Sequence, residues 1–308
     1  MRTVANARSW AIEELKRVQM TSPSVSADLL LAFVLGWDRV RVLAHPEEPV
    51  PDKTWARFEE LVLRRTKGEP LQYLTGEREF YGLVLRTGPG ALIPRPETEI
   101  LVEEAIRLMT HGSLPRARFL DIGTGAGCIA IAVAHAIPSA TGWAVDLSDR
   151  ALDMARGNAI RHGVAGRILL IRASLLECFP RHSTFDFIFC NPPYVALKDY
   201  DSLPSEVRDY EPHLALFGGE SGLEFYQELA TELPSRLVPG GYLLLELGAG
   251  QADEVRQLIE NEGLRVERIL DDLQGIPRCL VGRKVSRGPG AIHGQDSRCG
   301  RQAAGRTC

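Results

Sequence analysis

The stretch LDIGTGAGCIAIAVA, residues 120–134, joins a short apolar run to a longer one through a glycine-rich turn. Its composition predicts a buried strand that passes directly into a helix. Glycine suits such a turn because it tolerates positive φ and lets a ligand approach the backbone closely. The first N–H groups of the helix then remain free to bind that ligand. The stretch therefore indicates a ligand site in an α/β domain.

The loop 123–127 has the spacing G-x-G-x-G and departs from the G-x-G-x-x-G fingerprint of dinucleotide sites. Asp121, which precedes the first glycine by two positions, would repel a pyrophosphate. Asp146 ends the next expected strand, where a carboxylate can accept hydrogen bonds from both hydroxyls of a ribose. A nucleoside with a cationic tail, such as S-adenosylmethionine, suits both carboxylates. The alternative interpretation is a plain strand-to-helix turn with two solvated Asp residues.

Strand and helix patterns alternate outward from this turn, over residues 94–284. Strand-like runs lie at 116–123, 141–148, 167–174, 185–190, 241–248, 265–271 and 278–284. Helical patterns lie at 125–137, 148–163, 223–233 and 251–263. This rhythm predicts a mainly parallel sheet covered by helices on both faces. A ligand is then expected at the carboxyl ends of the strands, near the point where the strand order reverses.

Residues 1–76 have a different texture and predict a small helical domain. Ser9 is a candidate N-cap for the first helix. A strongly apolar helix is expected to end at Gly36, and another to run from Asp52 to Gly68.

Residues 77–93 predict two short strands around Gly88-Pro89-Gly90, which form a hairpin that links the two domains. The tail 285–308 is rich in Gly and Arg and lacks apolar periodicity, so it is expected to be disordered.

The composition excludes several classes of protein. The 308 residues include 36 basic and 40 acidic side chains, a formal net charge of −4, and the charges within residues 1–85 balance. We therefore expect no stable binding to nucleic acid. No apolar run approaches about 20 residues, which predicts no membrane span. The scattered cysteines and histidines predict free thiols, no metal site and a location in the cytoplasm.

A second motif follows the strand-like run FDFIFC, where the chain continues as Asn191-Pro192-Pro193-Tyr194. The Asn191 side-chain oxygen and the Pro192 carbonyl are two acceptors on a stiffened turn, and Tyr194 offers a flat face. Two such acceptors match a planar NH2 group and orient its nitrogen toward a methyl donor. Adenine's exocyclic amine and glutamine's amide both fit this description. The alternative is a strand exit that the prolines merely stiffen.

Together these residues resemble the class I S-adenosylmethionine-dependent methyltransferases, and more closely the HemK/PrmC family of release factor glutamine methyltransferases. The similarity covers residues 10–284, and its most specific motifs are LIPRPETEILVE (92–103) and EPHLALFGGESGLEFYQ (211–227). The family implies a Rossmann-like domain with a mainly parallel, seven-stranded sheet whose last strand is antiparallel.

The family's enzymes methylate the glutamine of the Gly-Gly-Gln tripeptide in class I peptide release factors, and S-adenosylhomocysteine is the other product. The resemblance implies a cofactor site formed by Asp121, Gly123, Thr124, Gly125, Ala126, Gly127, Asp146, Leu175 and Asn191. It implies that the substrate glutamine binds Asn191, Pro192, Pro193 and Tyr194, of which all but Pro193 act in catalysis. The helical domain is expected to dock the release factor. A related family methylates a glutamine of a large-subunit ribosomal protein. Its sequence differs where this chain has RPETE, which favours a release factor as the substrate.

Some positions keep two interpretations. Ser174-Leu175-Leu176 departs from the acidic residue and apolar or aromatic pair that the family places beside the adenine. The segment PRPETE, read alone, is a loop with a helix start at Glu97 or Thr98. Glu246 either lines the site edge or ends a strand in solvent. The competing functions are an adenine-amine methyltransferase acting on DNA or RNA and a cofactor-binding module without catalysis.

Overall fold

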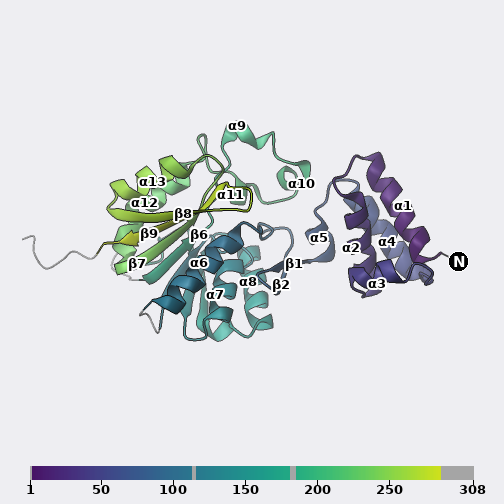
Figure 1. Ribbon diagram of the computed structural model, residues 1–308, viewed down its shortest axis with the longest axis horizontal. Helices are drawn as coiled ribbons and strands as arrows, with labels where there is room; N and C mark the ends of the chain where they lie inside the picture. Colours follow the sequence, from purple (N-terminus) through teal and green to yellow (C-terminus); the bar gives the residue numbers. More distant parts are fainter. Residues whose placement is uncertain (1, 113–115, 181–184, 286–308) are drawn as a thin grey trace, which may run out of the picture.

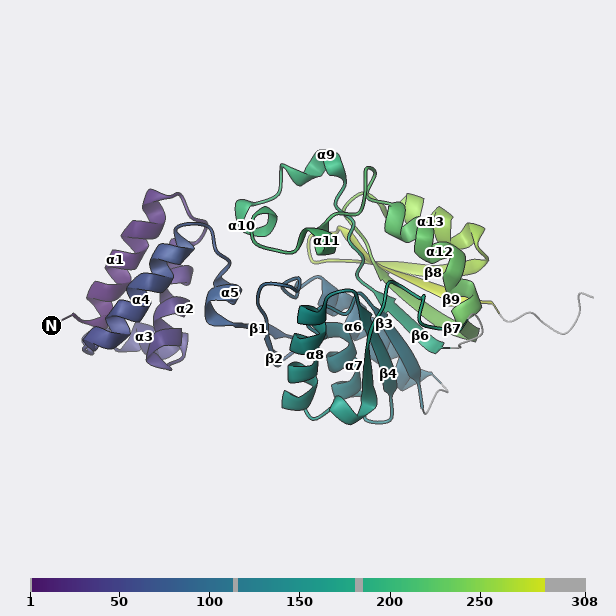
Figure 2. The same cartoon turned by 180° about the vertical axis from the view of Figure 1, so that it is seen from behind.

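The computed structural model describes residues 2–112, 116–180 and 185–285. A helical body at the N-terminus and a larger α/β body lie end to end along the long axis (Figures 1 and 2). From residue 286 on, the tail for which disorder was expected lies outside the described residues.

The helical body packs its helices around a single apolar core that includes Trp55, Phe58 and Leu61. Its helices are α1 (Val4–Arg17), α2 (Pro23–Leu35), α3 (Arg39–Ala44), α4 (Asp52–Arg65) and α5 (Leu71–Thr75). The prediction of Ser9 as an N-cap is wrong, because the N-cap of α1 is Thr3, six residues earlier, in a capping box. The helix end expected at Gly36 and the helix start expected at Asp52 are confirmed. The end expected at Gly68 is wrong, because α4 ends at Arg65 and residues 66–68 form a turn.

A two-stranded hairpin, β1 (Glu77–Phe80) and β2 (Leu83–Arg86), follows the helical body. Its turn is Tyr81-Gly82, both at positive φ of 50° and 73°, which is the geometry that a two-residue hairpin loop needs. The prediction of a turn at Gly88-Pro89-Gly90 is therefore wrong. Those residues lie in the loop that leads from the hairpin to the α/β body.

The larger body is built on a seven-stranded sheet with the order β5-β4-β3-β6-β7-β9-β8. The strands are β3 (Arg118–Ile122), β4 (Thr141–Asp146), β5 (Ile168–Arg172), β6 (Phe185–Cys190), β7 (Leu237–Glu246), β8 (Leu264–Asp271) and β9 (Pro277–Lys284). All neighbours pair in parallel except for β9, which is antiparallel to β7 and β8. The expected α/β fold, with its last strand antiparallel, is confirmed.

Helices cover both faces of this sheet, because alternate residues of each strand point to opposite sides. Phe119 belongs to one apolar cluster and Leu120 to the other. The first face carries α6 (Thr98–His111), α7 (Cys128–Ala136) and α8 (Asp149–Arg161), the last followed by the 3-10 turn η1 (Ala165–Arg167). The second face carries α12 (Glu224–Arg236) and α13 (Ala252–Asn261).

A segment that we call the strap, residues 197–216, leaves the sheet edge and passes close to the helical body. It contains three short helices, α9 (Leu197–Tyr200), α10 (Ser205–Arg208) and α11 (His213–Leu216). Both views place α10 on the side of the α/β body that faces α5 (Figures 1 and 2). The strap thus faces the N-terminal helices.

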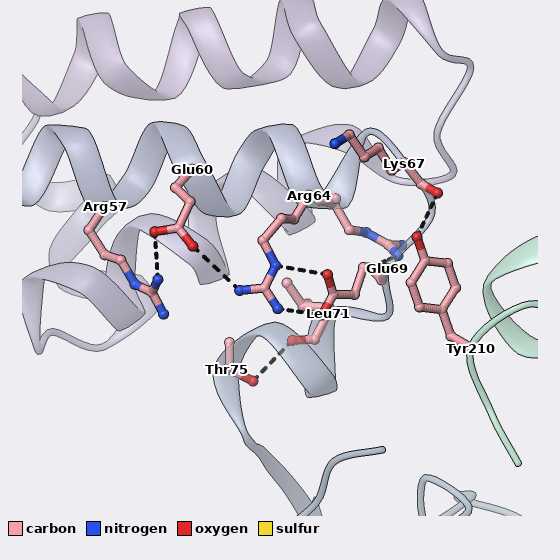
Figure 3. Close-up of polar contacts among 9 residues, drawn as sticks. Arg57, Glu60, Arg64, Lys67, Glu69, Leu71, Thr75 and Tyr210 are labelled. Atoms are coloured by element: carbon pink, nitrogen blue, oxygen red, sulfur yellow. Dashed lines mark hydrogen bonds and ion pairs between the residues drawn. The ribbon is translucent and has the colours of Figure 1, made fainter. Parts of the chain in front are cut away.

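Two polar contacts join the strap to the end of α4. Arg65 pairs with Glu206 at 2.6 Å, and the Tyr210 hydroxyl donates to the carbonyl of Lys67 at 2.9 Å. Figure 3 shows Tyr210 reaching Lys67 beside the ion pair of Arg64 with Glu69, which fixes the turn after α4. We call this set of contacts the joint.

The strand order reverses between β3 and β6. From β3 the chain adds β4 and β5 on one side, and then β6 and β7 on the other. Ile122 lies beside both Val145 and Cys190. The residues after β3, β4 and β6 therefore meet at one point of the carboxyl edge, where open α/β sheets bind their ligands.

Candidate active site

The glycine loop, residues 123–127, passes from β3 into α7 at this point. Its three glycines have φ of 70°, 57° and 86°, a region that favours glycine. A Cβ on Gly127 would lie 2.7 Å from the tip of the Ile131 side chain and 3.1 Å from the Cβ of Ala155, so the close approach of α8 also favours glycine there. A Cβ on Gly125 would meet nothing within 4 Å, so the backbone at Gly125 faces open space.

Asp121 is fully buried under this loop. Its Oδ2 accepts hydrogen bonds from the Thr124 hydroxyl at 2.6 Å and from Ala130 N at 3.2 Å. Its Oδ1 has no hydrogen-bond partner among the described residues. Burial raises the pKa of this carboxyl from 3.8 to about 7. An unpaired buried acceptor of this kind calls for a cationic or hydrogen-bonding partner from a ligand.

Asp146 ends β4 next to the glycine loop. Its two oxygens accept from Gly125 N and Ser148 N, both at 2.9 Å. Each carboxylate oxygen keeps a further lone pair, which suits the two hydroxyls of a ribose. Burial raises the pKa of Asp146 as well.

The other predicted cofactor residues differ in what they offer. The Thr124 hydroxyl is committed to Asp121, and Ala126 is buried in a small cluster with Ala91 and Ala151. Leu175 has a positive φ of 43° and packs against the second apolar cluster. It follows β5, which pairs with β4 up to Asp146, so Leu175 lies beyond the same sheet edge.

Asn191 directly follows β6 and lies beside the glycine loop. A Cβ built on Gly123 would be 4.0 Å from the Asn191 carbonyl oxygen. The Asn191 amide Nδ2 donates to Thr98 Oγ1 at 3.1 Å, and Thr98 Oγ1 donates to Glu246 Oε2 at 2.5 Å. Within the described part of the chain, no donor reaches Asn191 Oδ1 or the Pro192 carbonyl. We call Asn191, Pro192 and Tyr194 the acceptor site.

A pocket of about 210 Å³ opens on the acceptor site. Its lining comes from the loop before α6, from the acceptor site with the following Val195, and from the strap: Leu92, Arg95, Asn191, Pro192, Tyr194, Val195, Leu203, Val207, Ala215 and Leu216. Pro193 is not among these residues, although the sequence suggested it for substrate binding. The two motifs that are most specific in the sequence thus contribute Leu92, Arg95, Ala215 and Leu216 to the lining, and the residues after β6 and the rest of the strap complete it.

Buried polar contacts hold the pocket walls together. Glu211, in the strap just before α11, accepts from Arg95 Nη2 at 2.6 Å and from Ile93 N at 3.0 Å. Gln251 Nε2 donates to the Tyr194 carbonyl at 3.1 Å and so ties the acceptor site to the start of α13. The loop before α6, the strap and the acceptor site therefore form one frame.

Sequence reasoning missed Thr98, Arg95 and Glu211 as site residues. The interpretation of Glu246 as a solvated strand end is wrong, because that residue is 2% exposed. Its pKa is raised from 4.5 to about 7 by burial. A signal was present: Glu246 is an acidic residue within the apolar run LLLELG, where an unpaired charge is costly.

Two kinds of feature are absent from the described residues. In the described residues, no three side chains of the His, Cys, Asp or Glu type gather as they would around a metal ion. Searching the same residues finds no helix long and apolar enough to span a membrane.

The fold and site together define a class I S-adenosylmethionine-dependent methyltransferase. The seven-stranded sheet, the unpaired acid at Asp121 and the ribose-type acid at Asp146 fit a cofactor that is both a nucleoside and a cation. Comparison with known proteins agrees: the methyltransferase small domain matches residues 98–205, and the PrmC N-terminal domain matches residues 6–76.

The chain belongs to the family of release factor glutamine methyltransferases. It is 39% identical to the release factor glutamine methyltransferase of Koribacter versatilis, over 92% of this chain and 99% of that one. For that of Geobacter sulfurreducens the identity is 40%, over 91% and 96% of the two chains. The crystal structure of a methyltransferase from Pyrococcus furiosus shares the fold, with a TM-score of 0.50 and 21% identity, over 67% of this chain and 90% of that one.

Proposed function

We propose that this protein transfers a methyl group from S-adenosylmethionine to the side-chain amide nitrogen of the glutamine in the Gly-Gly-Gln motif of class I release factors. The observation that carries the proposal is the pocket of about 210 Å³. It opens on two free acceptors, Asn191 Oδ1 and the Pro192 carbonyl, beside the glycine loop. We place the reaction in the cytoplasm, where release factors act in translation.

Asp121, the glycine loop and Asp146 are the residues that would hold the cofactor. Oδ1 of Asp121 suits its ammonium group, the backbone at Gly125 allows close approach, and Asp146 suits its ribose. Leu175 and the Asn191 backbone lie on the same sheet edge. S-adenosylmethionine supplies an electrophilic methyl group when bound, and S-adenosylhomocysteine is the product.

The acceptor site makes the amide nitrogen of the substrate reactive. An amide nitrogen is a poor nucleophile because its lone pair is delocalised. Asn191 Oδ1 and the Pro192 carbonyl accept hydrogen bonds from its two N–H groups, orient the nitrogen and stabilise the positive charge that develops on it. Tyr194 packs against the planar amide. No base is needed, because the methylated nitrogen loses its extra proton to water.

We further propose that residues 1–76 form a domain that docks the release factor, with residues 77–93 as a linker and 94–284 as the methyltransferase domain. The balanced charge of the N-terminal region and the net charge of −4 favour a protein partner over nucleic acid. The joint places the helical body next to the pocket wall, so a protein bound there lies near the acceptor site.

A methyl-transfer assay with labelled S-adenosylmethionine tests this function. Purified release factor, unmethylated DNA and tRNA are offered separately, and mass spectrometry locates the methyl group. One methyl on the Gly-Gly-Gln glutamine is the expected result. Label in nucleic acid alone would overturn the proposal and leave an adenine-amine methyltransferase.

A further inference from the structure

Three side chains from distant parts of the sequence form a hydrogen-bonded chain that runs from Asn191 of the acceptor site into the buried interior. Asn191 follows β6, Thr98 begins α6 and Glu246 ends β7. The two hydrogen bonds measure 3.1 Å from Asn191 to Thr98 and 2.5 Å from Thr98 to Glu246. Thr98 is 1% exposed and Glu246 2% exposed, so water does not compete for these bonds.

The direction of the hydrogen bonds in this chain is fixed by its far end. An ionised carboxylate can only accept, so the single hydroxyl proton of Thr98 points to Glu246. Thr98 then faces Asn191 with a lone pair, which binds the NH2 side of the amide. Asn191 Oδ1 is consequently left on the opposite side, toward the pocket.

We propose that Thr98 and Glu246 are positioning residues, which hold the Asn191 amide with its oxygen toward the substrate. This inference rests on the proposed function and adds two residues to it. Without the chain, the amide can rotate by 180° and present its NH2 group to the NH2 group of the substrate. Two donors then face each other, and the acceptor that orients the nucleophile is lost.

The surroundings of Glu246 make this arrangement sensitive to pH. Charged and titratable groups face it from all the elements packed around it: Arg95 and Glu97 before α6, Cys128 on α7, Cys190 on β6, Tyr194, Tyr226 on α12, and Arg278 and Cys279 on β9. Arg278 is itself paired with Asp272 at 3.0 Å. Burial raises the pKa of Glu246 more than Arg95 and Arg278 lower it, and sets it at about 7.

Protonation of Glu246 reverses the donor at the end of the chain. A neutral carboxyl can donate to Thr98 Oγ1, which frees the Thr98 proton to point toward Asn191. The amide oxygen of Asn191 then turns inward to accept it. The rate of transfer is therefore expected to fall as the pH decreases through about 7.

The test compares substitutions at Thr98 with a matched control, assayed as methylation of release factor at saturating cofactor. Thr98→Val removes the hydroxyl at constant volume and should lower kcat by about 10- to 100-fold, with little change in KM. Thr98→Ser keeps the hydroxyl and should restore most of the rate. Thr87→Val is the control, because Thr87 is also buried but its hydroxyl has no partner among the described residues.

Glu246→Gln provides a second measurement that does not depend on the Thr98 variants folding. Its kcat should be lower than that of the wild type at pH 8. Its kcat should also no longer fall as the pH decreases through about 7, as that of the wild type is expected to do. Asp121 also titrates near 7. At saturating cofactor, a change in cofactor affinity caused by Asp121 does not alter the rate. Glu246→Gln also retains Asp121, so a pH effect that disappears in this variant belongs to Glu246. Binding of S-adenosylhomocysteine, measured by calorimetry, should be unchanged in all four variants.

The outcomes separate this inference from the function it rests on. If the wild type does not methylate the glutamine, the proposed function fails. If the wild type does so and Thr98→Val keeps its kcat, or Thr98→Ser is as slow as Thr98→Val, the positioning role is overturned. The positioning role is also overturned if the kcat of Glu246→Gln decreases near pH 7 as it does in the wild type.

Discussion

The glycine loop and the acceptor site lie side by side at the sheet edge but are built in different ways. The glycine loop is local: Asp121, Thr124 and the three glycines lie within seven consecutive residues. The acceptor site depends on contacts that join Asn191 to Thr98 across 93 positions of sequence and Thr98 to Glu246 across 148. Several of the groups proposed for the cofactor thus come from one turn, with Asp146 added from the next strand, whereas the proposed orientation of a substrate amide depends on several parts of the fold.

The largest expected effect separates the chemistry of the two regions. Asn191→Ala removes the side-chain acceptor and should reduce kcat by about 1000-fold, while binding of S-adenosylhomocysteine stays near that of the wild type. Asn261→Ala, an exposed change at the end of α13, is the matched control. Comparable losses of cofactor binding and of transfer would show that the two regions do not act separately.

The next effect concerns the glycine loop. Asp146→Ala removes the acceptors of Gly125 N and Ser148 N and the group proposed for the ribose. The Kd for S-adenosylhomocysteine, measured by calorimetry, should rise by about 10- to 100-fold, as expected for losing one or two hydrogen bonds to a charged group. Asp149→Ala, an exposed acid at the start of α8, should leave the Kd unchanged. Equal effects of both changes would argue against a direct role for Asp146.

The contrast between a local loop and a site built from distant residues also explains which features could be predicted from the sequence. The glycine loop, Asp146 and the order of strands and helices follow from local patterns, and the fold derived from them is confirmed. Thr98 looked like an ordinary helix start, because its partners Asn191 and Glu246 come from other strands. The hairpin turn was misplaced because Gly88-Pro89-Gly90 is the stronger turn signal, whereas Tyr81 takes a positive φ that its residue type does not favour.

A smaller effect is expected on the pH dependence of stability. It concerns the two buried carboxyls, Asp121 under the glycine loop and Glu246 behind Asn191. The pKa of Asp121 rises from 3.8 to about 7 in the folded state, so this group favours folding at low pH. Its contribution is complete below about pH 4 and is lost as the pH rises through about 7. Asp121→Asn should therefore stabilise the cofactor-free protein at pH 8 by on the order of 1–3 kcal/mol, while weakening cofactor binding.

Urea unfolding at pH 5 and pH 8 measures this effect. The decrease in the free energy of unfolding between the two pH values should be smaller in Asp121→Asn than in the wild type. Part of the decrease should remain, since Glu246 has a similarly raised pKa. An identical decrease in both proteins would mean that Asp121 does not titrate in this range.

The smallest effect lies at the joint. Tyr210→Phe removes one exposed hydrogen bond, to Lys67, worth up to about 1 kcal/mol. It should raise KM for the release factor by less than about fivefold and leave kcat unchanged. Tyr200→Phe is the control, because that hydroxyl bonds to Arg208 within the strap. A change in kcat rather than in KM would place the joint in the chemical step.

The strap also limits how members of this family can be recombined. Leu203 and Val207 line the pocket, while Glu206, between them in sequence, pairs with Arg65 of the helical body. A chimera that takes residues 1–76 from a relative without its strap exchanges one side of this contact. Leaving Glu206 opposite a foreign partner weakens the joint, whereas importing the strap replaces part of the pocket wall. Partner recognition and pocket shape are therefore expected to be exchanged together.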